Sequence, residues 1–371
     1  MTREREVVPE AEFRSYYGRP VLKPPVWHEP HMPTYLYLGG MSGASSTIAV
    51  MARLTGRTRL DRTARIAAAA GASLGAALLA AELGRPERFL NMLRIFKPTS
   101  PMSVGSWILA AQGGLSAVAL PGVLPGAVPG VLPGVLPAAG DAALLATGVT
   151  GPLTATYTAV LVADTAVPAW HEAYRELPFL FAGSAMAAAG AVAMLGTPRA
   201  QAGPARAVAA LGAATETVAG AVMERRLGFV GEPYRTGRAG RLMRAARALT
   251  VGGGLLAVVA GRSRALTALA GAALTAGSLC TRFGILEAGR ASAADPKYTV
   301  VPQRQRLDAA SAPAPDGDGP HAGRLPHEGG SVGGSVGGSV GDGPRAGHLP
   351  HDGGSDGDGP RAGHLPGDAG S

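Results

Sequence analysis

The chain has 371 residues, of which 46% are hydrophobic and only 16% are charged, and its formal net charge is +8. Its single cysteine, Cys280, excludes an internal disulfide, a Cys-ligated iron–sulfur cluster and a Cys-type zinc site. The first 33 residues are charged and rich in proline and aromatic side chains, without a short apolar core and cleavage site, so we expect no signal peptide.

Eight apolar stretches follow in the region from Tyr35 to Glu287, and each is near the length of roughly 20 residues that a helix needs to cross a bilayer. We place them at residues 34–53, 66–84, 103–120, 142–163, 177–196, 205–223, 248–261 and 265–286. A soluble alanine-rich bundle is the alternative, but amphipathic stripes are missing and the charges lie in the connections. The sequence therefore predicts an all-α polytopic membrane protein with about eight transmembrane helices, arranged as two four-helix bundles.

The rest of the chain is polar or of low complexity. We divide it into an N-terminal polar segment, 1–33, a membrane domain, 34–302, with a Pro/Gly-rich loop at 121–140, and a tail, 303–371. The tail repeats GGSV and a Gly-Pro-X-Ala-Gly-X-Leu-Pro element, and such segments bury too little apolar surface to offset their chain entropy. We expect the tail to be disordered.

Eight spans place both termini on one side of the membrane, which we call the terminal face. Its short segments carry 17 Lys/Arg against 9 on the opposite face. The positive-inside rule then favours a cytoplasmic terminal face of a multi-pass protein in the cell membrane.

Polar and ionisable side chains gather at the span ends that meet the terminal face. At 1.5 Å per residue they lie within roughly 15 Å of the same membrane surface. They include His28, His31, Tyr35, Glu82, Arg85, Ser103, Trp107, Tyr157, Asp164 and Glu216.

An ionisable group at membrane depth costs several kcal/mol or so unless it is paired or hydrated. One explanation for Glu82, Asp164 and Glu216 is that each reaches the headgroups separately; the other is a shared polar pocket. A pocket lined by tyrosine, histidine, tryptophan, serine and carboxylates suits a lipid-soluble quinone, whose oxygens accept hydrogen bonds and whose two-electron reduction is accompanied by proton uptake. No predicted span contains an interior histidine for haem, so electrons would pass to a cofactor on another subunit.

Several motifs give the chain a family resemblance. Gly-Arg-Pro-Glu-Arg-Phe at 84–89 and Lys-Pro-Thr-Ser-Pro-Met-Ser-Val-Gly-Ser-Trp at 97–107 resemble the membrane subunit of the polysulfide reductase/NrfD family. Three further stretches support this resemblance. The family's first span is similar to Pro-Thr-Tyr-Leu-Tyr-Leu-Gly-Gly-Met-Ser-Gly-Ala at 33–44, and its fourth to Tyr157-Thr158 followed by Val-Pro-Ala-Trp at 167–170. The end of the family's sequence resembles residues 288–296. The resemblance covers roughly residues 16–306.

The resemblance implies an eight-helix subunit that exchanges electrons between the quinone pool (menaquinone or ubiquinone) and an iron–sulfur subunit, itself usually joined to a molybdopterin-type catalytic subunit. It assigns Tyr157 to the quinone head group and places His28 or His31 where the family has a polar residue before its first span. The chain departs from the family at Ala159, where Gly is usual, and in the proline-rich insert at 121–137. In many relatives the partner lies outside the cytoplasm, whereas the charge count favours the inside.

We therefore expect Tyr157, Glu82, Asp164 and Glu216 to take part in the chemistry. We expect the quinone to contact His28, His31, Tyr35, Arg85, Ser103, Trp107 and Tyr157, with Ser103 as a possible helix N-cap. Neither a resident haem or iron–sulfur cluster nor a nucleic-acid partner is expected. The alternatives are a proton-coupled secondary transporter, which would place broken helices near the midplane, and a structural anchor without a ligand.

Overall fold

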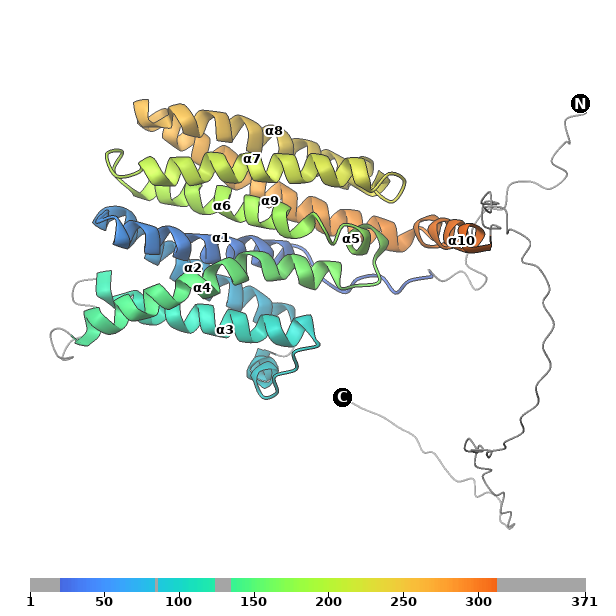
Figure 1. Ribbon diagram of the computed structural model, residues 1–371, viewed down its shortest axis with the longest axis horizontal. Helices are drawn as coiled ribbons and strands as arrows, with labels where there is room; N and C mark the ends of the chain where they lie inside the picture. Colours follow the sequence, from blue (N-terminus) through green and yellow to red (C-terminus); the bar gives the residue numbers. More distant parts are fainter. Residues whose placement is uncertain (1–20, 84–85, 124–134, 312–371) are drawn as a thin grey trace, which may run out of the picture. The chain divides into compact units, whose positions relative to one another are not determined.

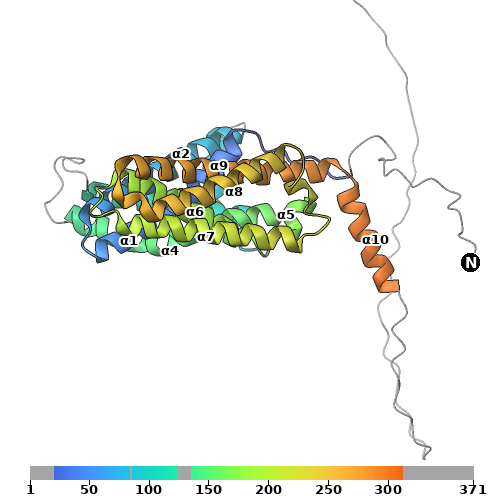
Figure 2. The ribbon, with the colours of Figure 1, turned by 90° about the horizontal axis from the view of Figure 1, so that it is seen from above.

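The computed structural model describes residues 21–83, 86–123 and 135–311 (Figure 1). Within these ranges all regular structure is helical, with ten α-helices and four short 3-10 helices. The long helices run side by side in both views (Figures 1 and 2). The all-α prediction is confirmed. Residues 303–311 of the predicted tail lie in the last helix, Lys297–Ser311, whereas the rest of the tail and most of the Pro/Gly-rich loop lie outside the described residues.

The long helices form two groups of four that follow one another in the chain. The first group is α1 (His31–Leu54), α2 (Thr58–Glu82), α3 (Pro101–Ala119) and α4 (Val135–Ala163). The second group is α6 (Leu177–Gly196), α7 (Gly203–Arg226), α8 (Gly237–Val259) and α9 (Arg264–Ala294). They match the predicted pair of four-helix bundles, and α1 and α4 pack against α6 where the bundles meet.

Short elements connect these helices. They are η1 (Pro86–Leu93), η2 (Pro121–Val123), α5 (Pro168–Glu172), η3 (Glu232–Tyr234) and η4 (Ala260–Arg262). After α9, the chain turns at Asp295 and Pro296 into α10 (Lys297–Ser311), which departs from the direction of the long helices (Figure 2).

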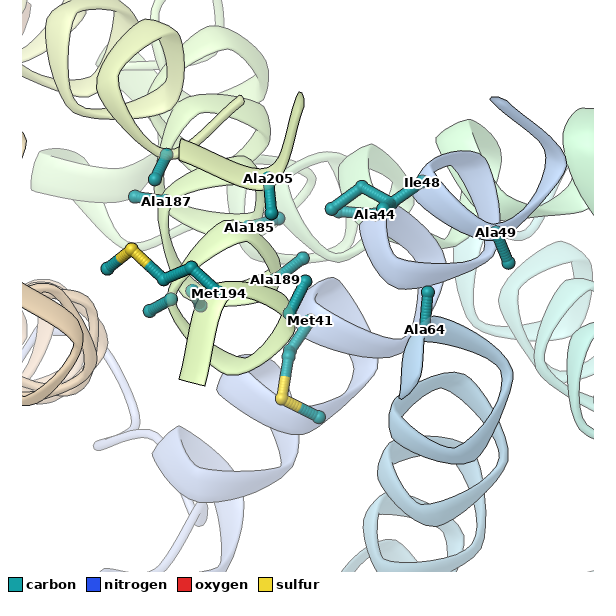
Figure 3. Packing of buried hydrophobic residues seen from close by; sticks show 14 of the residues in the cluster. Met41, Ala44, Ile48, Ala49, Ala64, Ala185, Ala187, Ala189, Met194 and Ala205 are labelled. Atoms are coloured by element: carbon teal, nitrogen blue, oxygen red, sulfur yellow. The ribbon is translucent and has the colours of Figure 1, made fainter. Parts of the chain in front are cut away.

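Small residues let the helices approach closely. Figure 3 shows Met41 and Ala44 of α1 packed among the alanines of α6, such as Ala185 and Ala189. Between α6 and α7, a Cβ added at Gly183 would lie 2.4 Å from the backbone nitrogen of Glu216. Helices in lipid associate through such close packing because apolar side chains gain little by leaving lipid tails.

Among the described residues, seven helices are long and apolar enough to cross a membrane, namely α2, α3 with η2, α4, α6, α7, α8 with η4, and α9. The predicted first span, α1, is absent from this set although its 24 residues extend about 36 Å. Its hydropathy is lowered by serines that are buried within the protein. Ser42 donates to the carbonyl of Ala68 at 2.7 Å, and Ser46 accepts from Gln112 at 2.6 Å. Because the hydroxyls of Ser42 and Ser46 are hydrogen-bonded inside the bundle, α1 can carry these polar side chains and still lie at the centre of the bundle.

The predicted start of the seventh span, at residue 248, is wrong because α8 begins at Gly237. Four arginines, at 238, 241, 244 and 247, suggested a connection. In the helix they occupy an exposed face, while Ala239, Met243 and Ala246 on the other face are buried. Arginines three residues apart can all lie on one face of a helix. The sequence prediction did not consider this and assigned these arginines to a connection between spans.

Candidate functional site

A cavity of about 390 Å³ opens among the helix ends of the first bundle, beside the start of α1 and the ends of α2 and α4. Its walls come from the segment before α1 and from α1, α2, η1, α3 and α4. Four predicted site residues line it: His28, Tyr35, Glu82 and Tyr157. The remaining lining is mostly apolar, with Val26, Trp27, Met32, Leu79, Leu83, Met92, Met102, Ser106 and Leu161.

Two tyrosine hydroxyls meet in this cavity. Tyr35 from α1 is almost fully buried, and its hydroxyl forms a hydrogen bond with the hydroxyl of Tyr157 from α4. Only one of the two protons can occupy that bond, so the other remains available to a ligand oxygen. The ring of Tyr157 fits because α3 has no side chain opposite it: a Cβ added at Gly105 would lie 2.3 Å from the ring.

Glu82, the last residue of α2, forms the polar end of the cavity. Its Oε1 accepts the backbone N–H of His28 at 2.7 Å and lies 3.2 Å from Nδ1 of the same residue. Nδ1 of His31 lies 3.7 Å from Oε2, which receives no hydrogen bond from the part of the chain that the structure describes. The side chain of Glu82 is 9% exposed, whereas His28 and His31 are 72% and 42% exposed. A sheltered carboxylate thus lies beside two imidazoles that reach the surface.

The wall that carries His28 is held by the second bundle. We call residues 26–30 the strap. The ring of Trp27 stacks on that of Trp170, with centroids 5.2 Å apart, and Trp170 donates from Nε1 to the carbonyl of Ile285 at 2.7 Å. A Cβ at Gly289 would overlap the Trp170 ring, so α9 accommodates the indole only because this residue is glycine.

Charged residues fix the strap at its other end. Glu29 accepts from Arg238 of α8 at 2.7 Å and from Arg290 of α9 at 3.3 Å. Arg290 also donates to the backbone carbonyl of Trp27. Residues more than 200 positions apart in the sequence therefore determine where His28 lies.

Other predicted site residues lie outside the cavity. Ser103 accepts the N–H of Lys97 at 3.0 Å and donates to the carbonyl of Ile95 at 3.2 Å, and the N-cap of α3 is Ser100, so the possible N-cap role of Ser103 is wrong. Trp107 is 41% exposed and packs edge-to-face on Phe96. Asp164 is exposed just beyond α4. Arg85 lies outside the described residues.

Glu216 belongs to a separate polar cluster in the second bundle, so the expected single pocket does not include it. Its carboxylate accepts from Thr281 of α9 at 2.5 Å and from Thr250 of α8 at 3.4 Å. Arg282 lies near this carboxylate, fully buried, and donates from Nη2 to the carbonyl of Phe181 at 3.1 Å. Its Nε and Nη1 have no hydrogen-bond partner among the described residues.

The sequence interpretation missed the apolar lining and the part played by Gly105 and Ser106. Both belong to the Ser-Val-Gly-Ser-Trp segment at 103–107, from which only Ser103 and Trp107 are assigned to the predicted site. Consecutive residues of a helix point about 100° apart, so Ser106 faces the cavity while Trp107 faces outward. Gly105 marks the side of this helix that faces Tyr157. Without that information, the sequence does not show that Ser106, rather than Trp107, faces the cavity.

No curated protein matches the chain. The family model described as polysulfide reductase, of the NrfD type, matches residues 14–295, which include both bundles and the whole cavity. The chain therefore belongs to the polysulfide reductase (NrfD) family of membrane subunits of oxidoreductases.

Proposed function

We propose that the cavity binds a quinol and that the chain passes its two electrons to an iron–sulfur subunit docked on the terminal face. The observation that carries the proposal is the meeting of two tyrosine hydroxyls and a sheltered carboxylate–imidazole cluster in one apolar-walled cavity. Apolar walls accommodate the ring and isoprenoid tail, and a few convergent polar groups orient the head.

In this mechanism, the hydroxyl pair of Tyr35 and Tyr157 holds one oxygen of the quinol. Oxidation to the quinone releases two protons and two electrons. Glu82 accepts the two protons in turn on its free oxygen, and His28 and His31 carry each of them from Glu82 to water at the surface. The electrons leave to the partner subunit, since the predicted spans contain no interior histidine to bind a haem.

The basic residues of the terminal face support docking of an acidic partner there. The family consists of subunits of oxidoreductase complexes, which supports an iron–sulfur partner and a molybdopterin-type catalytic subunit in the same assembly. The charge count supports a cytoplasmic terminal face in the cell membrane.

Substituting Tyr157→Phe tests the proposal. The variant keeps the ring against Gly105 and removes only the hydroxyl, so insertion and assembly stay intact while quinol-dependent reduction of the partner falls about tenfold or more, the effect of one lost hydrogen bond in the transition state. Tyr37→Phe is the matched control: Tyr37 is a buried tyrosine on α1 that does not line the cavity. Equal turnover of Tyr157→Phe and the wild type would remove Tyr157 from the site.

Binding of a quinone analogue to the purified subunit separates this function from that of a structural anchor. An anchor without a ligand site would bind no analogue, and Tyr157→Phe would change nothing.

A proton-coupled transporter is the second candidate, and the cluster of Glu216, Thr281 and Arg282 favours it. These residues are buried within the second bundle, away from the cavity, and ionisable groups at membrane depth commonly mark ion pathways. Liposomes containing the subunit and a trapped pH dye test it: a transporter admits protons down a gradient without quinol, and Glu216→Gln abolishes the flux. Absence of flux in the wild-type subunit rejects this candidate.

A further inference from the structure

A second recess, distinct from the cavity, lies on the outer surface of the second bundle between the start of α6 and the middle of α7. Its volume is about 530 Å³, and it shares no residue with the cavity. Thr215, Val218 and Val222 line its α7 side together with two alanines, and Phe179 lines its α6 side.

The walls of this groove face the hydrocarbon. Phe179 is 65% exposed, Val218 is 63% exposed and Val222 is 48% exposed, and both helices are long and apolar enough to span the membrane. The α7 lining extends from Ala214 to Val222, a length of about 12 Å along the helix. A groove of this length and apolar character accommodates part of an acyl chain.

Charge at the mouth of the groove is positive. Arg175 and Glu176 precede α6 and form its polar end. Glu176 is neutralised by Arg226, whose Nε and Nη2 donate to the two carboxylate oxygens at 2.5 and 2.7 Å. Arg175 has no carboxylate partner among the described residues: its Nε donates to the hydroxyl of Tyr174 at 2.9 Å, and its guanidinium lies 5.4 Å from the centre of that ring.

We propose that this groove binds one anionic glycerophospholipid, with an acyl chain along Phe179 and Val218 and the phosphate on Arg175. An arginine fork at a membrane interface pairs preferentially with phosphate oxygens. The stacking of Arg175 on Tyr174 orients the guanidinium and leaves its terminal N–H groups available. An anionic headgroup adds charge attraction that the zwitterionic phosphatidylcholine lacks.

Native mass spectrometry of the detergent-purified chain tests the proposal. The chain is titrated with phosphatidylglycerol or with phosphatidylcholine of the same acyl composition. We expect one phosphatidylglycerol to bind about tenfold more tightly than phosphatidylcholine, and Arg175→Gln to abolish this preference, because a charge-assisted hydrogen bond is lost.

Two further variants keep the result interpretable. Val218→Trp fills the groove from an exposed position and should reduce binding of both lipids. Arg241→Gln removes an exposed arginine of α8 and should change neither. Equal retention of the two lipids by the wild type, or an unchanged preference in Arg175→Gln, overturns the proposal, as does finding a quinone or a partner helix in the groove.

Discussion

The strap offers the sharpest test of how the second bundle shapes the cavity of the first. Glu29→Gln keeps the size of the side chain but removes its charge. Exposed ion pairs contribute about 0.2–1 kcal/mol each. Glu29 is 19% exposed, while Arg238 and Arg290 are 50% and 30% exposed, so its two pairs together contribute at most ~2 kcal/mol.

Glutamine retains a hydrogen-bonding oxygen, so we expect a loss of about 1.4 kcal/mol, which is tenfold in the opening equilibrium. The strap remains mostly closed because the Trp27–Trp170 stack contributes about 0.5–1.5 kcal/mol and the His28–Glu82 backbone hydrogen bond about 1 kcal/mol. Quinol-dependent turnover should therefore fall by less than tenfold, and the free energy of unfolding should fall by no more than the same ~1.4 kcal/mol.

Hydrogen exchange measures the opening directly, since the N–H of His28 is bonded to Glu82. A peptide covering residues 26–30 should exchange about tenfold faster in Glu29→Gln than in the wild type, and about 1 M salt should reduce the difference by screening the pairs. Glu232→Gln, which removes an ion pair to Lys297, is the matched control and should leave the strap unchanged. Equal exchange of the strap in Glu29→Gln and wild type would refute this account.

Two further predictions concern packing and buried charge. Gly105→Ala places a methyl group 2.3 Å from the Tyr157 ring, so the ring must move: we expect lower quinol turnover and a loss of about 1–3 kcal/mol in stability, whereas Gly113→Ala, on the same helix with open space around it, should be neutral or slightly stabilising in turnover and thermal-melt assays. Arg65→Met removes a 2%-exposed guanidinium that donates to Asp61 and Asp141; Asp141 keeps its pair with Arg53 at 2.6 Å, but the buried Asp61 carboxylate is left uncompensated, which should cost about 3–5 kcal/mol in a thermal melt. Arg62→Met, at an exposed position of the same helix, should cost little, and an equal loss in both variants would contradict the assignment.

Much of the fold was predictable because each span is a local property of the chain. Hydropathy located α6 at residues 177–196, in agreement with the structure, since Thr197 and Pro198 end it abruptly. It misplaced the start of α8, where the arginines lie on one exposed face, and it overestimated the apolar character of α1, where buried serines bond to neighbouring helices. Both errors arise because hydropathy averages over a helix and ignores which neighbour each face meets.

The sequence predicts how deep each candidate site residue lies in the membrane, but it does not predict which side of its helix faces a neighbouring helix. A rise of 1.5 Å per residue correctly places Tyr35, Glu82 and Tyr157 near one boundary. It places Glu216 at a comparable depth, about ten residues from the end of α7, but says nothing about lateral position, and that carboxylate lies among Thr250 and Thr281 of the second bundle.

The strap could not be predicted from the sequence at all, because its contacts join Glu29 to residues 238 and 290. It also links two parts of the protein that hydropathy treats as independent. His28 contacts the carboxylate of the cavity, and the adjacent Glu29 contacts the arginines of α8 and α9. Since consecutive residues share a rigid peptide plane, neither contact can shift far without the other. The second bundle is therefore part of the cavity's construction, although none of its helices contributes a lining side chain.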